Sequence, residues 1–490
     1  MPYASRWTRY AERTCLAILF AWLVWLPLPF GSIVERARLP LVAVPLAVCI
    51  AAAAIRLWAT RDRGNTAQPT RAWLIWGNGA LLFLLVASLQ LVPLPQSLLQ
   101  LASPESHAIW SRAARVAALA GVSVSSAHPI SVDPQATAFE LFRLAAMLAA
   151  FVAAALMIRS HSRRMVLASV LCVAAAFEAM YGMREAALQR YEIWGWVNKL
   201  IFNRVTGTFV NPNHFAHYVA IVLPMALFLI AVAWHLTGND EVPAAQRFLR
   251  LIEHHLLRTA VGLLAAVACV AAILLAQSRG AFLAVTVTLL ALAAMLPGRR
   301  LARIALGSAA GLVLVTALVL FLGPDRTVRR FVPSEAEQVT LIGRRIGISA
   351  AIGIWQRFSI FGSGVGTFDR VVSLEQQRDP DKIYHHAHND YVEIAATSGT
   401  LGFTIAMVTL IAGYVALVRT TFGAAARELT WRRRAFQAAA LTSLTIAMVH
   451  ALLDFNFFIP SNPATLATIL GAAVATVDHD RKPERRRPGG

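Results

Sequence analysis

Repeated apolar segments of about 20 residues, separated by short polar clusters, constrain the fold of this chain more than any other feature. An α-helix of about 20 apolar residues crosses the hydrocarbon core of a bilayer. Barrel strands instead alternate apolar and polar residues over about ten positions, a pattern absent from this sequence. The sequence therefore predicts an all-α, polytopic membrane helix bundle. Its roughly twelve predicted spans lie near residues 15–34, 39–58, 72–93, 138–158, 165–183, 213–234, 257–276, 280–297, 301–322, 390–418, 435–456 and 462–478.

The low share of charged residues agrees with this interpretation, since it is 14% against about 25% in a typical soluble domain. The formal net charge of +19 raises the question of a nucleic-acid partner. Most Arg residues, however, lie in short clusters between apolar segments, where the positive-inside rule explains them. We therefore expect membrane lipid around the chain and no nucleic acid. The four cysteines fall within apolar segments and are interpreted as core residues, not as a disulfide or zinc framework: Cys15, Cys49, Cys172 and Cys269.

The basic clusters also orient the chain in the membrane. They recur at every second connection between the predicted spans, which predicts that both termini are cytoplasmic. The first apolar segment ends without a small-x-small cleavage site, so we expect it to be retained as a helix. Residues 1–480 are interpreted as one integral-membrane domain, and residues 481–490 as a basic cytoplasmic tail.

Three long connections fall on the opposite face, at residues 94–137, 184–212 and 323–389. We expect them to roof an active site, because function concentrates on loops held by a rigid scaffold. The longest contains a predicted helix near 339–358, followed by a glycine-rich segment at 362–366. No strand precedes these glycines, as a dinucleotide site would require, so we interpret the segment as a flexible substrate-facing loop.

A dense polar segment at 384–391 runs directly into an apolar helix. Asn389 or Asp390 is suited to cap that helix, which places the segment at a membrane face. His388 can then act as a general base near neutral pH, although a structural or capping histidine is the simpler alternative. Zinc is a second alternative, but the spacing fits no ligand pattern and HExxH is absent. The zinc ligands would come from His385, His386, His388, Asp390 and Asp369.

Two arginines predict an anion site on the same face. Arg279 lies in a very short turn between apolar segments, where a charged residue is costly and indicates a functional site. Arg204 precedes a junction where Asn211 or Asn213 can cap a helix that begins at Pro212. The alternatives are a snorkelling arginine and an ordinary loop–helix junction. Two guanidiniums together indicate a phosphate or carboxylate ligand, and on a face without ATP we expect a polyprenyl pyrophosphate.

A further acidic residue, Asp454, follows His450 by four positions, so both are expected on one helix face near the outer end of a span. Either the two side chains pair, or Asp454 orients a residue of the site.

A pattern of His-Asn, nine residues, Gly, two residues and Gly begins at His388 and contains Gly399 and Gly402. Together with the segments around Arg204 and Arg279, it resembles the O-antigen ligase and polymerase family of bacterial envelope enzymes, whose pattern is His-[Asn/Ser]-x9-Gly-x-x-Gly. The resemblance covers residues 80–475. Segments similar to those of polymerase-type members are 91–95, 130–134 and 454–460.

The resemblance implies a metal-independent, inverting glycosyltransferase of the bacterial inner membrane, without a cofactor and with its site facing the periplasm. The donor would be an undecaprenyl-pyrophosphate-linked glycan, and the acceptor a glycan or lipid A-core. As catalytic residues, His388 would deprotonate the acceptor hydroxyl, and Arg204 and Arg279 would bind the pyrophosphate and stabilise this leaving group. The predicted substrate-binding residues are Asn211, Asn213, His214, Asn389 and Asp454.

The acceptor distinguishes the members of this family. A ligase joins glycan to lipid A-core, a polymerase joins lipid-linked repeats, and related protein O-oligosaccharyltransferases glycosylate protein. Segments 91–95 and 131–134 favour a polymerase, and the sequence at 454–456 departs from the Glu-Tyr-Pro of the oligosaccharyltransferases. A lipid-linked oligosaccharide flippase is the alternative from another class, but it needs charges through the midplane, where the sequence offers Arg143 and Glu178. A membrane metalloprotease is a third class of protein that the sequence leaves open.

Overall fold

The structure, a computed structural model, describes residues 2–61, 69–123, 125–198, 204–238, 242–295, 335–375, 384–424 and 429–475. Its α-helices are α1 (Pro2–Trp25), α2 (Arg38–Arg61), α3 (Arg71–Ser88), α4 (Gln96–Ala102), α5 (Pro104–Leu119), α6 (Pro134–Met157), α7 (His161–Ala187), α8 (Pro212–Leu236), α9 (Ala244–Leu275), α10 (Arg279–Met295), α13 (Glu335–Arg357), α14 (Phe368–Val371), α15 (Asp390–Phe422), α16 (Trp431–His450) and α17 (Ser461–Val474). Shorter 3-10 helices are η1 (Phe30–Ser32), η2 (Glu35–Ala37), η3 (Leu89–Leu91), η4 (Val372–Leu374) and η6 (Asn456–Phe458). Two antiparallel strand pairs join β1 (Leu94–Pro95) to β2 (Ala127–His128), and β3 (Glu192–Ile193) to β4 (Trp196–Val197). The predicted all-α class is confirmed.

Seven helices among the described residues are long and apolar enough to cross a membrane, as expected of a multi-pass membrane protein. They cover Glu35–Trp58, Arg71–Leu91, Pro134–Met157, His161–Ala187, Pro212–Leu236, Ala244–Leu275 and Asp390–Phe422. The predicted segments outside 301–322 each overlap one helix of the bundle. Segment 301–322 lies outside the described residues, so the count of twelve spans stays a prediction.

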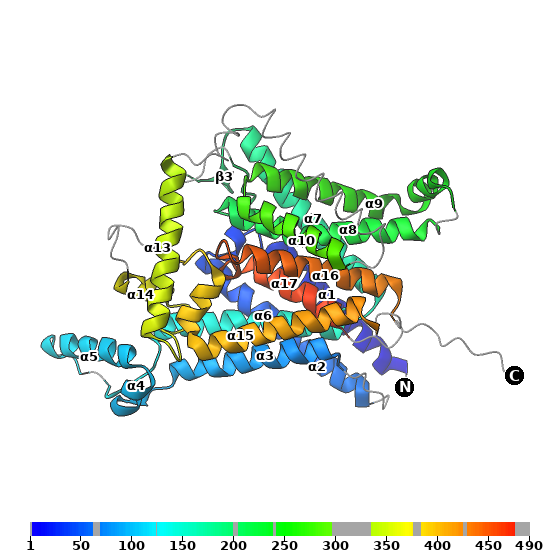
Figure 1. The fold of residues 1–490 in the computed structure, drawn as a ribbon. Helices are drawn as coiled ribbons and strands as arrows, with labels where there is room; N and C mark the ends of the chain where they lie inside the picture. Colours follow the sequence, from blue (N-terminus) through cyan, green and yellow to red (C-terminus); the bar gives the residue numbers. More distant parts are fainter. Residues whose placement is uncertain are drawn as a thin grey trace.

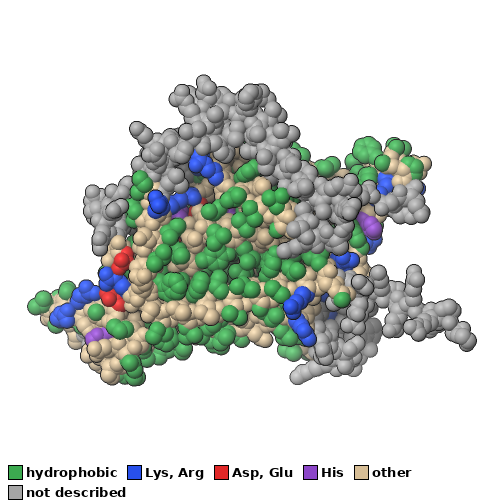
Figure 2. Space-filling view, in the orientation of Figure 1, with side chains coloured by type: hydrophobic (Ala, Val, Ile, Leu, Met, Phe, Trp, Pro, Cys, Tyr) green, Lys and Arg blue, Asp and Glu red, His purple; other side chains and the backbone are tan. Residues whose placement is uncertain are grey.

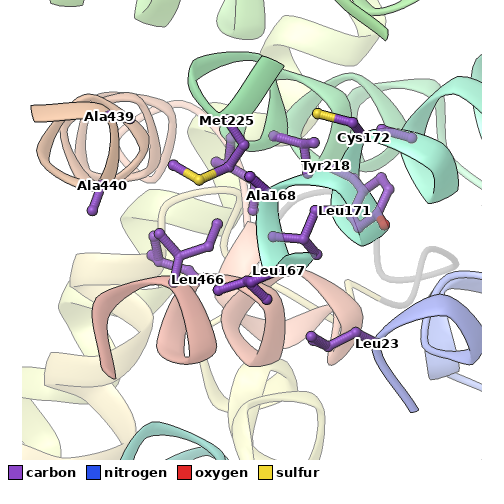
Figure 3. Packing of buried hydrophobic residues seen from close by; sticks show 14 of the residues in the cluster. Leu23, Leu167, Ala168, Leu171, Cys172, Tyr218, Met225, Ala439, Ala440 and Leu466 are labelled. Carbon is purple, nitrogen blue, oxygen red and sulfur yellow. The ribbon is translucent and has the colours of Figure 1, made fainter. Parts of the chain in front are cut away.

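Helix α8 is the most deeply buried of these seven helices, and it packs against α7, α9 and α16. Figure 1 shows α8 beside α7 and α9. Every residue from His214 to Ala226 is buried. Side chains of α1, α7, α8, α16 and α17 meet in one apolar cluster, part of which is shown in Figure 3. Small residues allow close helix approach: a Cβ at Gly262 of α9 would lie 3.2 Å from the carbonyl oxygen of Ala226. This rigid core fixes the start of α8, which carries predicted site residues.

Hydrophobic side chains cover the middle of the face shown in Figure 2, and most of its Lys and Arg side chains lie outside that band. The two charges predicted within spans have protein partners. Arg143 donates from Nε to Glu140 at 2.8 Å and from Nη1 to the carbonyl oxygen of Phe457 at 2.9 Å. Glu178 accepts from the backbone N of Thr208 at 2.8 Å and from its hydroxyl. Inside the bundle, Arg143 is therefore paired with a carboxylate, whereas Glu178 is hydrogen-bonded to a neutral residue.

The elements of the first and third long connections lie at one end of the bundle. Figure 1 shows α4, α5, α13 and α14 at this end, and the start of α1 at the other. The first and third long connections are hydrogen-bonded to each other there, because the backbone N of Val132 donates to the carbonyl oxygen of Ser363 at 3.0 Å. We call this the outer end.

Near the outer end, helix α15 is interrupted at Gly399, which has a left-handed φ of +68°. The backbone of residues 359–364 replaces helical hydrogen bonds lost there: Gly364 N, for example, donates to the carbonyl oxygen of Thr397 at 3.0 Å. A Cβ at position 399 would lie 2.3 Å from the carbonyl oxygen of Ile360, so glycine is required for this contact. The first glycine of the predicted motif thus joins α15 to the preceding segment.

The glycine-rich segment 362–366 is largely buried and hydrogen-bonded to other segments, which contradicts the prediction of a flexible loop. Val365 and Gly366 nevertheless line an apolar cavity. Ser363 is 0% and Val365 3% exposed, and Val365 N donates to Gln90 Oε1 at 3.0 Å. A Cβ at Gly364 would lie 2.6 Å from the hydroxyl oxygen of Ser131. These glycines allow close packing against the first connection, a tertiary contact that the sequence pattern does not reveal.

Candidate functional site

His388 lies in the turn that leads into α15. The neighbouring Asn389 caps the helix, since its Oδ1 accepts from the backbone N of Tyr391 at 3.0 Å and of Val392 at 3.2 Å. This confirms one of the predicted caps. His388 has a φ of +55°, a conformation that non-glycine residues adopt infrequently and that often marks functional positions. Its side chain is 26% exposed, so the imidazole is accessible.

Contacts of Glu393 with His386 and with the backbone of Ala387 stabilise this turn. His386 Nδ1 lies 2.8 Å from Glu393 Oε1, and the backbone N of Ala387 donates to Glu393 Oε2 at 2.7 Å. Burial opposes the charge on His386, but attraction from Glu393 outweighs it and raises the pKa of His386 above its ordinary value. We therefore interpret His386 as structural, which leaves His388 as the candidate base of the segment.

Asp454 is the carboxylate that faces His388. Its Oδ1 lies 3.1 Å from His388 Nδ1; its Oδ2 accepts from Asn213 Nδ2 at 2.9 Å and lies 3.3 Å from Arg344 Nη2. Asp454 is 1% exposed. Burial alone would raise the pKa of Asp454, but the imidazoles of His214 and His388 and the Arg344 guanidinium hold it well below its ordinary value. Asp454 is consequently an anion at neutral pH.

A path of side-chain contacts connects Arg204 to His388. Arg204 Nη2 donates to Asn213 Oδ1 at 3.1 Å, and Asn213 Nδ2 donates in turn to Asp454. Asp454 then faces His388. The structure thus brings together two predicted catalytic residues, Arg204 and His388, with two predicted substrate-binding residues, Asn213 and Asp454.

Arg204 also holds the turn that carries Arg279. Its Nε donates to the carbonyl oxygen of Ala276 at 2.8 Å, and its Nη2 to that of Gln277 at 3.2 Å. Arg279 is the first residue of α10 and is exposed. The two arginine segments are therefore adjacent, and the N-terminus of α10 adds the positive end of a helix dipole. Together they make a setting suited to an anion.

Two further predicted residues lie at the start of α8. Asn211 is the N-cap of this helix, since its Oδ1 accepts from the backbone N of Asn213 at 2.8 Å. His214 is buried, and its Nε2 lies 3.8 Å from Asp454 Oδ1, which is too long for a hydrogen bond. The contact is electrostatic when the ring is protonated.

Phe455 packs three imidazoles of the site around one ring. Its centroid lies 4.2 Å from His386 in a stacked arrangement, and 4.5 Å from His214 and 4.9 Å from His388 in edge-on arrangements. Its backbone N also donates to Asp454 Oδ1 at 3.0 Å. An aromatic residue directly after the carboxylate therefore restrains both the acid and the histidines that surround it.

Asp454 and His450 do not share a helix face, so that prediction is wrong. Helix α16 ends at His450, and Asp454 follows in a turn, where its backbone N donates to the carbonyl oxygen of His450 at 3.2 Å. The His450 ring instead contacts His217 of α8, with their Nδ1 atoms 3.1 Å apart. The predicted alternative, that Asp454 orients a site residue, fits this geometry.

The residues considered as zinc ligands face other partners. His386 faces Glu393, and Asp390 accepts from the backbone N of Phe457 at 3.2 Å. In the part of the chain that the structure describes, no three His, Cys, Asp or Glu side chains are grouped so that they could hold a metal ion. Cys15, Cys172 and Cys269 are buried, as predicted for core residues, whereas Cys49 is partly exposed.

Arg344 of α13 is a site residue that the sequence did not reveal. Its Nη1 donates to the carbonyl oxygen of Leu453 at 3.0 Å, beside the contact of Nη2 with Asp454. The helix itself was predicted, but nothing in the sequence distinguishes Arg344 from the adjacent Arg345.

This arrangement combines a base with an anion site. When Nδ1 of a neutral imidazole faces a carboxylate, the proton stays on Nδ1 and Nε2 presents a lone pair. His388 is in this situation, and Arg204 is connected to the same carboxylate. The site can therefore accept a proton at one end and bind a negatively charged group at the other.

Residues 264–407 match the protein family described as O-antigen ligase. No protein of curated function matches the chain. The matched region runs from α9 into α15, so it contains Arg279, Arg344 and His388, whereas Arg204 and Asp454 lie outside it.

Proposed function

We propose that this chain, whose residues 264–407 match the O-antigen ligase family, transfers a glycan from undecaprenyl pyrophosphate to an acceptor hydroxyl. The family indicates a glycosyltransferase-type enzyme, and the apolar helices indicate a multi-pass membrane protein. The observation that carries the proposal is the path of contacts from Arg204 through Asn213 and Asp454 to His388. It supports one site that holds both a base and a cation.

In the proposed reaction, His388 acts as the general base. The acceptor oxygen attacks the anomeric carbon of the donor and gives its proton to His388 Nε2. The bond between that carbon and the pyrophosphate oxygen breaks, and undecaprenyl pyrophosphate leaves with the electron pair. Attack opposite the leaving group inverts the anomeric configuration. Asp454 keeps the His388 ring in the required tautomer and stabilises the imidazolium that forms.

Arg204 and Arg279 bind the pyrophosphate and stabilise the charge that develops on the leaving group. This assignment is supported by the adjacency of their segments and by the N-terminus of α10. Arginine suits this role because it stays charged and forms paired hydrogen bonds with phosphate oxygens. Two guanidiniums supply the positive charge that a metal ion supplies in other transferases, so the proposed mechanism is metal-independent.

The remaining predicted residues have different proposed roles. Asn213 and His214 lie beside Asp454 and are proposed to border the substrate. Asn211 and Asn389 act through the backbone: both cap helices, and Asn389 Nδ2 donates to the carbonyl oxygen of Leu452 at 3.0 Å. They hold the starts of α8 and α15, and through them the site.

The setting of the proposed reaction is the bacterial inner membrane, with the outer end facing the periplasm. Roughly twelve spans and two cytoplasmic termini complete this topology. A polymerase that joins lipid-linked repeats is favoured over a ligase by segments 91–95 and 131–134. The partners are then the lipid-linked donor and a glycan or lipid A-core acceptor. The internal charges Arg143 and Glu178 have protein partners, which favours an enzyme over a flippase.

The test is the envelope glycan of a strain deleted for this protein, complemented with wild type, His388→Ala or the control His385→Ala. His385 belongs to the same polar segment but is exposed. We expect wild type and His385→Ala to restore the glycan, and His388→Ala to accumulate in the membrane without restoring it. Restoration by His388→Ala would contradict the assigned base.

The deletion profile also separates the possible acceptors. Single repeat units on lipid A-core identify a polymerase, and long chains that remain on the carrier lipid identify a ligase. A complete surface glycan in the deletion strain overturns both versions and favours a protein O-oligosaccharyltransferase.

A further inference from the structure

Helix α13 contacts both segments that carry the pair His388 and Asp454. On the acid side, Arg344 donates to the carbonyl oxygen of Leu453 and lies 3.3 Å from the Asp454 carboxylate. One guanidinium therefore holds both the backbone before Asp454 and its side chain. This two-point contact fixes the direction in which the carboxylate points.

On the histidine side, α13 presses against the backbone that precedes His388. A Cβ at Gly347 would lie 3.3 Å from the carbonyl oxygen of Ala387 and 3.4 Å from that of His386. The helix therefore passes close to the backbone of these two residues. Ala351, one turn further, is fully buried and belongs to a small apolar cluster that also includes Ala387. The face of α13 that bears Arg344, Gly347 and Ala351 is thus the face directed at the site.

We propose that α13 positions the His388–Asp454 pair and that Arg344 is the positioning residue through which it acts on Asp454. The inference rests on the proposed function and names a determinant of that reaction which neither the family match nor the motifs assign. Arg344 acts through Asp454 and does not touch the reacting atoms. Without it, Asp454 keeps its contacts with Asn213 and His388 but loses a cation and the anchor at Leu453.

The expected signature is a loss of turnover without a loss of donor binding. A misplacement of catalytic groups by about 1 Å reduces rates by roughly 100-fold, whereas Arg204 and Arg279 still bind the pyrophosphate. Lysine at position 344 keeps the positive charge but lacks the fork that reaches two acceptors. We therefore expect an intermediate rate from Arg344→Lys.

The experiment measures release of polyprenyl pyrophosphate in proteoliposomes, with lipid-linked glycan extracted from the deletion strain as substrate. Wild type, Arg344→Ala, Arg344→Lys and Arg345→Ala are compared, since Arg345 is the adjacent residue of the same charge and is exposed. We expect Arg344→Ala to lower kcat by roughly 10- to 100-fold with little change in donor KM, and Arg345→Ala to match wild type.

A second variant tests whether α13 positions the His388–Asp454 pair, and it leaves the Arg344 guanidinium in place. It replaces Arg344→Ala as the test if that variant does not fold. Gly347→Ala adds a methyl group against the backbone of His386 and Ala387. We expect it to lower kcat at unchanged donor KM. Wild-type kinetics in both Arg344→Lys and Gly347→Ala would overturn the proposal.

The outcomes separate this inference from the function on which it rests. If His388→Ala is inactive and Arg344→Ala behaves like Arg345→Ala, the positioning role is wrong and the proposed function stands. If Arg344→Ala raises donor KM and retains kcat, Arg344 binds substrate and the positioning role is again wrong. If His388→Ala turns over the donor at the wild-type rate, the proposed function is wrong. The positioning role of Arg344, which rests on that function, is then wrong as well.

Discussion

Asn213 and Asp454 are 241 positions apart in the chain, yet Asn213 Nδ2 donates to Asp454 Oδ2 at 2.9 Å. The amide is suited to this position because its other end, Oδ1, accepts from Arg204. A single side chain thus joins a guanidinium to the carboxylate that faces His388.

Asn213→Asp should remove the hydrogen bond to Asp454 and keep the hydrogen bond from Arg204. The new carboxylate still accepts from Arg204, but it faces Asp454 with a like charge in place of a donor. Loss of a buried hydrogen-bond partner costs about 1–3 kcal/mol, so we expect transfer to slow by roughly 5- to 150-fold. Initial rates in proteoliposomes measure this. A variant as fast as wild type would show that the link is dispensable.

Asp454→Asn should change the pH dependence of stability. The folded-state pKa of Asp454 lies below its ordinary value, so the ionised carboxylate stabilises the folded state above about pH 4. That contribution is lost as pH falls through the lower, folded-state pKa. We expect wild type to melt at a higher temperature than Asp454→Asn by a constant margin between about pH 8 and about pH 5, and the margin to shrink only below about pH 4. A margin that already shrinks near neutral pH would contradict this interpretation.

The pair of His386 and Glu393 should respond to pH in the opposite direction. The pKa of His386 is raised, so the pair stabilises the turn fully below about pH 6.5 and loses this contribution as pH rises through the folded-state pKa. We expect hydrogen exchange at residues 384–391, corrected for intrinsic rates, to increase on the alkaline side. His386→Gln should abolish this pH dependence, whereas His385→Gln, at an exposed position, should retain it.

Gly399→Ala should destabilise the protein without touching the catalytic groups. Its φ of +68° is unfavourable for alanine, and the added Cβ would meet the carbonyl oxygen of Ile360. We expect a loss of at least about 2 kcal/mol, seen as a lower melting temperature. The control is Gly77→Ala in α3, where the nearest atom to the new Cβ is a ring carbon of Trp73 at 4.0 Å. It should be neutral or stabilising by about 0.5–1 kcal/mol.

Local sequence signals predicted the parts of the site that depend on local structure. The caps at Asn211 and Asn389 follow from side chains that satisfy their own helix starts, so the residue type and its position were sufficient. The short turn between two apolar segments predicted where Arg279 lies, and the structure places it at the start of α10. Apolar length located the helices of the bundle.

Contacts between distant segments were not predictable in this way. The end of α16 at His450, and not four residues later, decides that Asp454 faces His388, and no residue in that stretch marks the helix end clearly. Likewise, the burial of Ser363 depends on packing against a connection more than 200 positions earlier in the chain. Choosing Arg344 over Arg345 required the docking of α13, which only the tertiary structure supplies.

The position of Asp454 in the chain has a consequence for biogenesis. Arg204, Arg344 and His388 are all synthesised before it, and each depends on its carboxylate directly or through Asn213. Until α16 has been inserted and the turn after His450 has formed, these groups lack their common anion. A nascent chain that already exposes its arginines and its histidine to lipid-linked glycan is therefore expected to be inert, and the enzyme becomes competent only at the end of membrane insertion.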